Sequence, residues 1–132
     1  MSSPDHPPAA PSTDEAPFDL VVVGAGLSGV GAAAEFLREL PGRRIAVLES
    51  RADIGGTWDL FRYPGVRSDS DMFTFGYRLR PWRGLVSMVD GPSIREYIRS
   101  TAAEFGVLPL IRFNQRVTRL EWSSAEALWT LT

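Results

Sequence analysis

A glycine-rich run near the start of the chain has the residue types and the spacing of a turn that binds phosphate. The run is Gly24-Ala25-Gly26-Leu27-Ser28-Gly29. In such a turn the first glycine permits a tight bend, the second lets the backbone approach a pyrophosphate, and the third lets a helix pack closely on a strand. The helix N-terminus then supplies amide donors and partial positive charge, and Ser28 adds a hydroxyl or amide.

Glu49, twenty residues after Gly29, is the second residue with interpretable chemistry. At the end of a second strand, a carboxylate accepts hydrogen bonds from both ribose hydroxyls of an adenosine and repels a ribose phosphate. We therefore expect FAD or NAD, rather than NADP, at this first nucleotide site. The alternative is an unrelated α/β domain in which the glycines cap a helix and the glutamate is solvated.

The elements that such a site requires surround the glycines. Residues 18–23 form a β-branched run typical of a strand buried on both faces, and residues 44–49 form a second such strand. Between them, residues 30–40 place Val30, Ala33, Ala34 and Leu37 at helical spacing, before Pro41-Gly42 ends the helix. Strand, helix and strand in about 30 residues predict a parallel βαβ unit, which is an α/β fold.

A long irregular segment, residues 50–92, follows the second strand and is punctuated by glycine and proline. Segments of this kind are usually functional. The paired glycines of Gly55-Gly56-Thr57-Trp58 bring backbone near a ligand and favour FAD over NAD, since a simple NAD domain more often enters another helix here. Aromatic residues of the segment either wall a flat ring or belong to the core; they are Trp58, Phe61, Tyr63, Phe73, Phe75 and Tyr77.

The last third of the chain predicts a helix and short strands. Ser93 and Glu96 match a capping box, and the apolar residues that follow form one helical face, ended by Gly106. Residues 110–113, 115–122 and 127–131 match strands, the last two joined by a turn at residues 123–126. We expect a small antiparallel β-meander here.

Composition excludes several classes of protein. The chain has 132 residues, 44% of them hydrophobic, with a net charge of -2, which is typical of one globular domain and gives no footprint for nucleic acid. No apolar run is long enough to span a bilayer, and no signal peptide is evident, so a cytoplasmic location is expected. The chain lacks cysteine, and its one histidine, His6, has no partners for a metal site. We expect residues 1–17 to be a disordered Pro-rich leader and residues 18–132 to be the domain.

A resemblance to a known family rests on two stretches. Gly55-Gly56-Thr57-Trp58, followed by Arg62-Tyr63-Pro64-Gly65-Val66-Arg67-Ser68-Asp69, resembles the flavin-proximal pattern of Baeyer–Villiger monooxygenases. The similarity runs from Phe18 to the end of the chain and is greatest to the branch that contains the mycobacterial ethionamide-activating monooxygenase. It implies a Rossmann-like FAD-binding domain. It also implies hydride transfer from NADPH to FAD, reaction of the reduced flavin with oxygen, and oxygenation of a ketone or a sulfur atom.

Carried over position by position, the resemblance assigns roles to individual residues. Those implied to bind the pyrophosphate, the ribose or the flavin end are Gly24, Gly26, Ser28, Gly29, Glu49, Gly56, Thr57, Trp58, Asp59 and Leu60. Arg67, Ser68 and Asp69 are implied to face bound nicotinamide, with Asp69 beside the isoalloxazine as the catalytic residue. Val117, in an expected strand of residues 116–118, is implied to hold the adenine through its backbone, although plain strand core explains it equally well. No arginine of the chain is assigned the family's catalytic cation.

The chain also departs from that family. Family members are several times longer, and this sequence has no second Gly-x-Gly-x-x-Gly motif for NADPH and no histidine-containing linker fingerprint. We therefore expect an incomplete sheet, and an FAD-binding part of a monooxygenase that is inactive alone. One alternative is a noncatalytic flavin-binding module that needs a separate chain for the NADPH domain. Another is the NAD domain of an ordinary dehydrogenase. The substrate and the oligomeric state are not determined by these residues.

Overall fold

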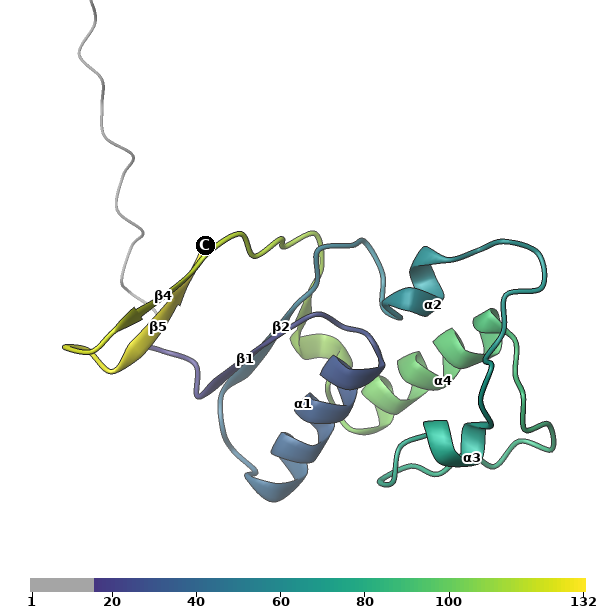
Figure 1. Cartoon of the computed structure of the whole chain (residues 1–132). Coiled ribbons are helices and arrows are strands. Elements are labelled where there is room, and N and C mark those ends of the chain that lie inside the picture. The colour runs from purple at the N-terminus through teal and green to yellow at the C-terminus, as the bar shows by residue number, and fades with distance from the viewer. Residues whose placement is uncertain (1–15) are drawn as a thin grey trace, which may run out of the picture.

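The computed structural model describes residues 16–132, and the expected leader of residues 1–17 therefore lies almost wholly outside the described residues. Figure 1 shows an α/β arrangement in which strands and helices alternate along the first part of the chain. The elements are β1 (Leu20–Val23), α1 (Leu27–Glu39), β2 (Ile45–Leu48), α2 (Thr57–Leu60), α3 (Met72–Phe75), α4 (Gly91–Glu104), a 3-10 turn (Leu108–Leu110), β3 (Ile111–Arg112), β4 (Leu120–Ser123) and β5 (Leu128–Leu131).

The predicted βαβ unit is confirmed. β1 and β2 are parallel, with Leu20 opposite Ile45 and Val23 opposite Leu48, and α1 connects them. β3 pairs in parallel with the other edge of β2, so the sheet order is β1-β2-β3. Because parallel strands end at the same edge of a sheet, the turn after β1 and the segment after β2 emerge side by side.

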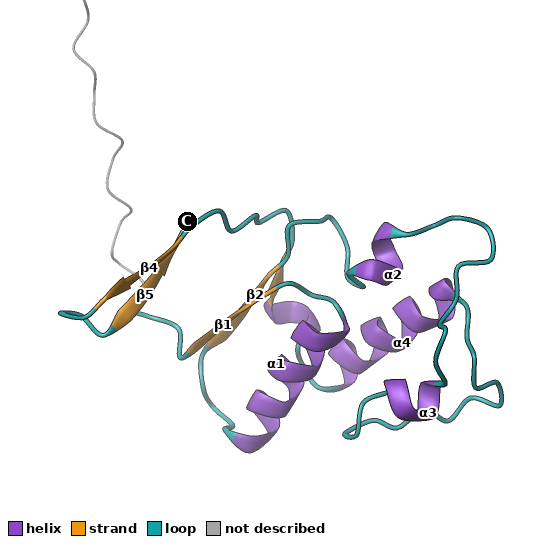
Figure 2. Cartoon of the chain, in the orientation of Figure 1, coloured by secondary structure: helices purple, strands orange, loops and turns teal. Residues whose placement is uncertain are grey.

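The helices and the hairpin lie on opposite sides of this sheet (Figure 2). Alternate residues of β2 separate the two sides: Ile45 and Val47 enter the buried cluster with α1 and α4, whereas Ala46 and Leu48 line a groove beside the β4-β5 hairpin. The core therefore lies between the sheet and the two long helices. Its fully buried side chains include Val30 of α1 and Ile94 and Ile98 of α4.

The expectation that the first strand is buried on both faces is wrong. β1 is half-buried, and Val23 is 56% exposed. The physical reason is position, since β1 is an edge strand of the described sheet and its second face meets the open groove rather than a packed layer. The same β-branched composition in the central strand β2 is buried.

The predicted capping box at Ser93 and Glu96 is wrong, although the predicted buried face of this helix, α4, is confirmed. α4 begins at Gly91, and its N-cap is Asp90, whose Oδ1 accepts from the backbone N of Ser93 at 2.8 Å. Pro92 fits the first turn because it lacks only an N–H that the first turn leaves unpaired. The buried residues of α4 recur at helical spacing as predicted, and Gly106 follows the helix with a φ of 71°.

The C-terminal strands differ from the expected meander. Residues 115–119 form no strand, so Val117 lies outside β4 and is half-buried. The backbone N of Gln115 donates to the Glu49 carbonyl at 2.9 Å, which ties this stretch to the chain that leaves β2. β3 joins the parallel sheet, and the antiparallel part is the β4-β5 hairpin alone, in which Trp122 lies opposite Trp129.

Within residues 16–132, none of the helices has the length and apolar character needed to cross a membrane. The same residues contain no group of three or more His, Cys, Asp or Glu placed to hold a metal ion.

The reassigned helix cap yields a direct prediction. Replacing Asp90 with alanine removes the acceptor for the Ser93 amide and should lower the free energy of unfolding by about 1 kcal/mol. Ser93→Ala is the matched control and should change it by less than about 0.5 kcal/mol, because no side-chain hydrogen bond of Ser93 is found in the described chain. Urea unfolding followed by tryptophan fluorescence measures both, and a larger loss from Ser93→Ala would contradict the assignment.

Candidate functional site

Two glycine turns meet backbone to backbone at the edge of the sheet where β1 and β2 end. The amide of Gly55 donates to the Ala25 carbonyl at 3.0 Å. A Cβ added to Gly56 would lie 3.0 Å from the Cα of Gly26, which is tighter than an ordinary contact. The two turns are separated in sequence by β2 and α1, and the fold brings them together.

A cleft of about 440 Å³ opens between the turns. It is lined by Val23, Gly24, Gly26, Leu27, Ser28, Gly29, Gly55, Gly56, Thr57, Trp58 and Phe75. The first turn of α1 faces this cleft, and no side chain of the described residues caps it. Its amides, together with the partial positive charge of a 13-residue helix, are therefore available to an anion.

The third glycine of the first turn is required for packing. A Cβ at Gly29 would lie 1.9 Å from the carbonyl oxygen of Gly24 and 3.3 Å from the Val22 side chain. The close approach of α1 to the end of β1 therefore depends on this glycine, as expected. Gly24 itself has a φ of 102°, a conformation that side chains rarely adopt.

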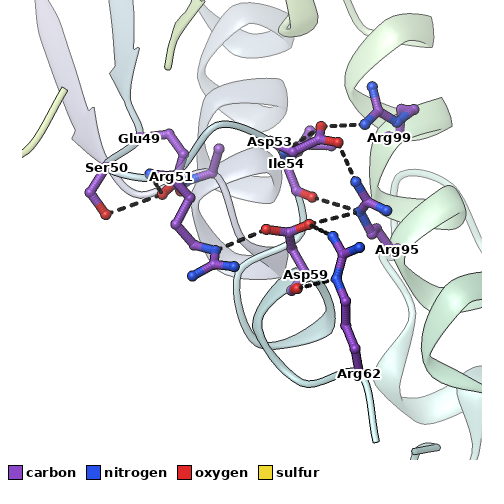
Figure 3. Close-up of polar contacts among 10 residues, drawn as sticks. Glu49, Ser50, Arg51, Asp53, Ile54, Asp59, Arg62, Arg95 and Arg99 are labelled. Carbon is purple, nitrogen blue, oxygen red and sulfur yellow. Dashed lines mark hydrogen bonds and ion pairs between the residues drawn. The ribbon is translucent and has the colours of Figure 1, made fainter. Parts of the chain in front are cut away.

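Glu49 lies directly behind the first turn. Its side chain is 5% exposed; Oε2 accepts from the Ala25 amide at 2.7 Å, and Oε1 accepts from the Arg51 amide at 2.8 Å. The carboxylate therefore joins the turn after β1 to the segment after β2. Figure 3 shows Glu49 beside Ser50 and Arg51 of that segment. That Glu49 also accepts hydrogen bonds from a ribose stays a prediction.

Asp59, in the short helix α2, carries a buried carboxylate that is surrounded by arginines. It is 3% exposed, and its oxygens lie 2.8 Å from Nε of Arg51, 2.6 Å from Nη2 of Arg62 and 3.2 Å from Nε of Arg95. Burial alone would raise the pKa of Asp59, but hydrogen bonds from Arg51 and Arg62 and the charge of Arg95 hold it below its ordinary value. The group is therefore ionised and fully engaged within the protein.

A second carboxylate extends this network to α4. Asp53 pairs with Arg95 and Arg99, and Nε of Arg95 also donates to the Ile54 carbonyl at 3.3 Å (Figure 3). Sequence reasoning missed these partners. The available signal was the spacing of Arg95 and Arg99, which are four residues apart and share one helical face.

Tyr77 supports the other side of the first turn. Its hydroxyl donates to the carbonyl of Leu27, the first residue of α1, at 2.6 Å, and burial raises the pKa of this phenol. A Cβ added to Gly31 would lie 2.8 Å from the Tyr77 ring, so the ring packs closely on the helix. Of the two roles that the sequence left open for Tyr77, ring wall or core, these contacts favour the core.

The structure brings some of the predicted site residues to the cleft and leaves others away from it. Thr57 and Trp58 line it, whereas Leu60 is exposed and the Asp59 side chain is turned into the arginine network. Trp58 meets Phe75 edge to face, with ring centroids 6.1 Å apart. Val117 does not line the cleft.

The predicted nicotinamide-facing residues lie in another segment. Arg67 forms an isolated antiparallel bridge with Asp90, and Ser68 is buried with its hydroxyl donating to the Ser70 carbonyl at 2.6 Å. Asp69 is exposed, and none of the three lines the cleft. Their roles toward flavin and nicotinamide stay predictions.

Comparison with known protein families finds one match over this region. Residues 22–87 match the model of the NAD(P)-binding Rossmann-like domain. The matched range is half of the chain and contains both glycine turns, Glu49 and α2.

Curated relatives are monooxygenases. The chain is 57% identical over 114 residues to the FAD-containing monooxygenase MymA of Mycobacterium tuberculosis and 53% identical over 114 residues to the FAD-containing monooxygenase EthA of the same organism. Each alignment covers 86% of this chain and 23% of the relative. The chain thus spans about a quarter of the length of the curated relatives that it matches.

Solved structures of similar fold include Baeyer–Villiger enzymes. A steroid monooxygenase bound to NADP matches with a TM-score of 0.79 and 31% identity, over 86% of this chain and 22% of that one. A complex of OTEMO with FAD and NADP matches with a TM-score of 0.76 and 30% identity, over 87% of this chain and 22% of that one. The resemblance noted in the sequence is thereby confirmed.

The contrasting surroundings of two glycines yield a prediction. Gly29→Ala should lower the free energy of unfolding by about 3 kcal/mol or more, since its Cβ overlaps the Gly24 backbone. Gly26→Ala is the matched control and should change stability by less than about 1 kcal/mol, because its Cβ would make an ordinary 3.5 Å contact with Gly56. Denaturant unfolding of both variants checks this, and equal losses would show that Gly29 is not the packing glycine.

Proposed function

The chain belongs to the family of NAD(P)-binding Rossmann-like domains, and on that premise we propose that it is the FAD-binding part of an NADPH-dependent flavoprotein monooxygenase. One observation carries the proposal: two glycine turns pack against each other beside the uncapped N-terminus of a 13-residue helix. Such a helix end binds phosphate groups. The similar proteins are FAD-containing monooxygenases.

The residues present fit FAD better than a nicotinamide cofactor at this cleft. The buried carboxylate of Glu49 stands behind the first turn, where it favours ribose hydroxyls and repels a ribose phosphate. The second glycine turn and Trp58 also line the cleft, so the cleft extends past the phosphate-binding turn itself. Because Gly26 and Gly56 have no Cβ, the space between the two turns stays open.

We assign roles to the residues on this basis. Gly24, Gly26, Ser28 and Gly29 would hold the pyrophosphate, and Glu49 would hold the adenosine ribose. Gly56, Thr57 and Trp58, with the backbone of Asp59 and Leu60, would face the flavin. The roles of Arg67, Ser68, Asp69 and Val117 rest on the family resemblance alone. When bound, FAD would supply the redox chemistry, while these residues bind it, orient it and exclude water from it.

The reaction of the whole protein extends this proposal. From the resemblance to Baeyer–Villiger monooxygenases we propose oxygenation of a ketone or a sulfur compound at the expense of NADPH; the similar proteins include an FAD-containing monooxygenase and a steroid monooxygenase bound to NADP. Residues 1–132 contain one Gly-x-Gly-x-x-Gly turn, and we propose that these residues bind FAD and are not reduced by NADPH on their own.

The deciding experiment is an absorbance spectrum of the purified chain after addition of FAD and removal of the excess, followed by addition of NADPH. We expect retained flavin absorbance that NADPH does not bleach. Absence of retained flavin would overturn the FAD assignment, and bleaching would overturn the proposal that these residues on their own are not reduced by NADPH.

A substitution in the first turn tests the pyrophosphate site. Gly26→Val should weaken FAD binding by at least about 100-fold, or roughly 2.7 kcal/mol, because the added side chain occupies the approach between the two turns. Ala32→Val adds a side chain of the same kind on an exposed position of α1 and serves as the control. Titration of flavin fluorescence measures both dissociation constants, and equal affinities would contradict the motif assignment.

Removal of the ribose acceptor should have a smaller effect. Glu49→Ala deletes one charge-assisted hydrogen-bond acceptor, which corresponds to about a 10- to 100-fold loss in FAD affinity. Glu49→Gln retains an oxygen for the Ala25 amide and should lose less. The same titration separates the three proteins, and a Glu49→Ala protein that binds FAD as tightly as the parent would argue against a role for this carboxylate.

A further inference from the structure

The buried carboxylate of Asp59 joins the segment that follows β2 to the distant helix α4. Arg51 follows β2, Arg62 follows α2 and Arg95 lies in α4, and all three guanidinium groups reach the same two oxygens (Figure 3). Arg62 also donates from Nε to the Asp59 carbonyl at 3.0 Å. A carboxylate with this many charged donors holds its neighbours in one arrangement.

Asp53 fixes the same stretch from its other end. Arg95 bridges Asp53 and Asp59, and Arg99 adds a second bond from α4 to Asp53. The chain between the two aspartates is therefore bound to α4 at both ends. It contains Gly55-Gly56, the turn that lies against the first glycine turn.

The paired glycines need such support. Gly55 has a φ of 128° and Gly56 a φ of 56°, and glycine backbone loses more freedom on ordering than any other residue. Neither glycine has a side chain to pack. The network lies directly over the turn, since a Cβ at Gly55 would lie 3.0 Å from Cγ of Arg95 and 3.3 Å from Cβ of Asp59.

We propose that Asp59 is a positioning residue. Through Arg51, Arg62 and Arg95 it holds the Gly55-Gly56 turn against the first turn, and so shapes the cleft for FAD before the cofactor binds. The inference rests on the proposed function for its ligand, but it assigns Asp59 a role that its carboxylate performs away from the cofactor.

The sign of the effect on affinity separates this role from simple electrostatics. The network holds four guanidinium groups and two carboxylates, so it carries surplus positive charge. Neutralising Asp59 increases that surplus and, by charge alone, would strengthen the binding of an anionic pyrophosphate. Loss of positioning weakens binding instead.

The first measurement is the FAD dissociation constant of Asp59→Asn in the full chain. We expect at least about a 10-fold increase, and an unchanged or lower value overturns the proposal. Glu104→Gln is the control: this carboxylate, on α4, also pairs with an arginine, Arg80 at 2.6 Å, but it lies outside the network. It should leave the dissociation constant unchanged.

The second measurement is amide hydrogen exchange without FAD, which judges the positioning role even if FAD does not bind. The Gly55 amide, bonded to the Ala25 carbonyl, should exchange faster in Asp59→Asn relative to the amides of β2. Unchanged protection of Gly55 in the folded variant overturns the proposal. Failure of the parent chain to bind FAD, with faster Gly55 exchange in the variant, would instead reject the FAD assignment and keep the positioning role.

A milder variant covers the case in which Asp59→Asn does not fold. The Arg62 side chain is 65% exposed, and in the described part of the chain it pairs only with Asp59. Arg62→Gln should therefore raise the FAD dissociation constant and speed Gly55 exchange in the same direction, by smaller factors. No change in either quantity would count against the proposal.

Discussion

The structure depends on one close approach, the contact between the backbones of two glycine turns. At Gly26 and Gly56 the chains lie so near that a side chain on Gly56 would press on the Cα of Gly26. The bond from the Gly55 amide to the Ala25 carbonyl holds the two turns together. The cleft, the exposed end of α1 and the place of Trp58 all follow from this contact, because each belongs to one of the two turns.

The rest of the fold brings the turns to that contact and holds them there. Parallel pairing of β1 and β2 places both turns at one edge of the sheet, and Glu49, at the end of β2, accepts from the Ala25 amide of the first turn. α4 packs on the same side and reaches the second turn through Arg95. Desolvation of the buried Asp59 carboxylate offsets much of its attraction to the arginines, so these ion pairs add little net stability.

The two faces of the sheet are unequal, and this affects how ligand binding and folding are linked. The helical side holds the buried core, while the side toward the hairpin keeps Val23 and Trp129 more than half exposed. A chain with one packed layer has less apolar burial with which to oppose conformational entropy. A cofactor that binds the folded form at a hundred times its dissociation constant would add about 2.7 kcal/mol, a large share of the stability of a small domain.

Local pattern in the sequence determined the βαβ unit, the glycine turn, the buried face of α4 and the resemblance of the second turn to a flavin site, because periodicity and turn chemistry act over a few residues. Where the sequence offered more than one candidate cap or strand, the tertiary structure decided which of them formed. Asp90 rather than Ser93 caps α4. Residues 115–119 form no strand, since Gln115 bonds to Glu49 after β2 whereas Thr118 and Arg119 bond to Thr132. It also decided the exposure of β1, which depends on its place in the sheet, and the meeting of Asp59 with Arg95. Those outcomes depend on which distant segments pair, and spacing along the chain does not encode that choice.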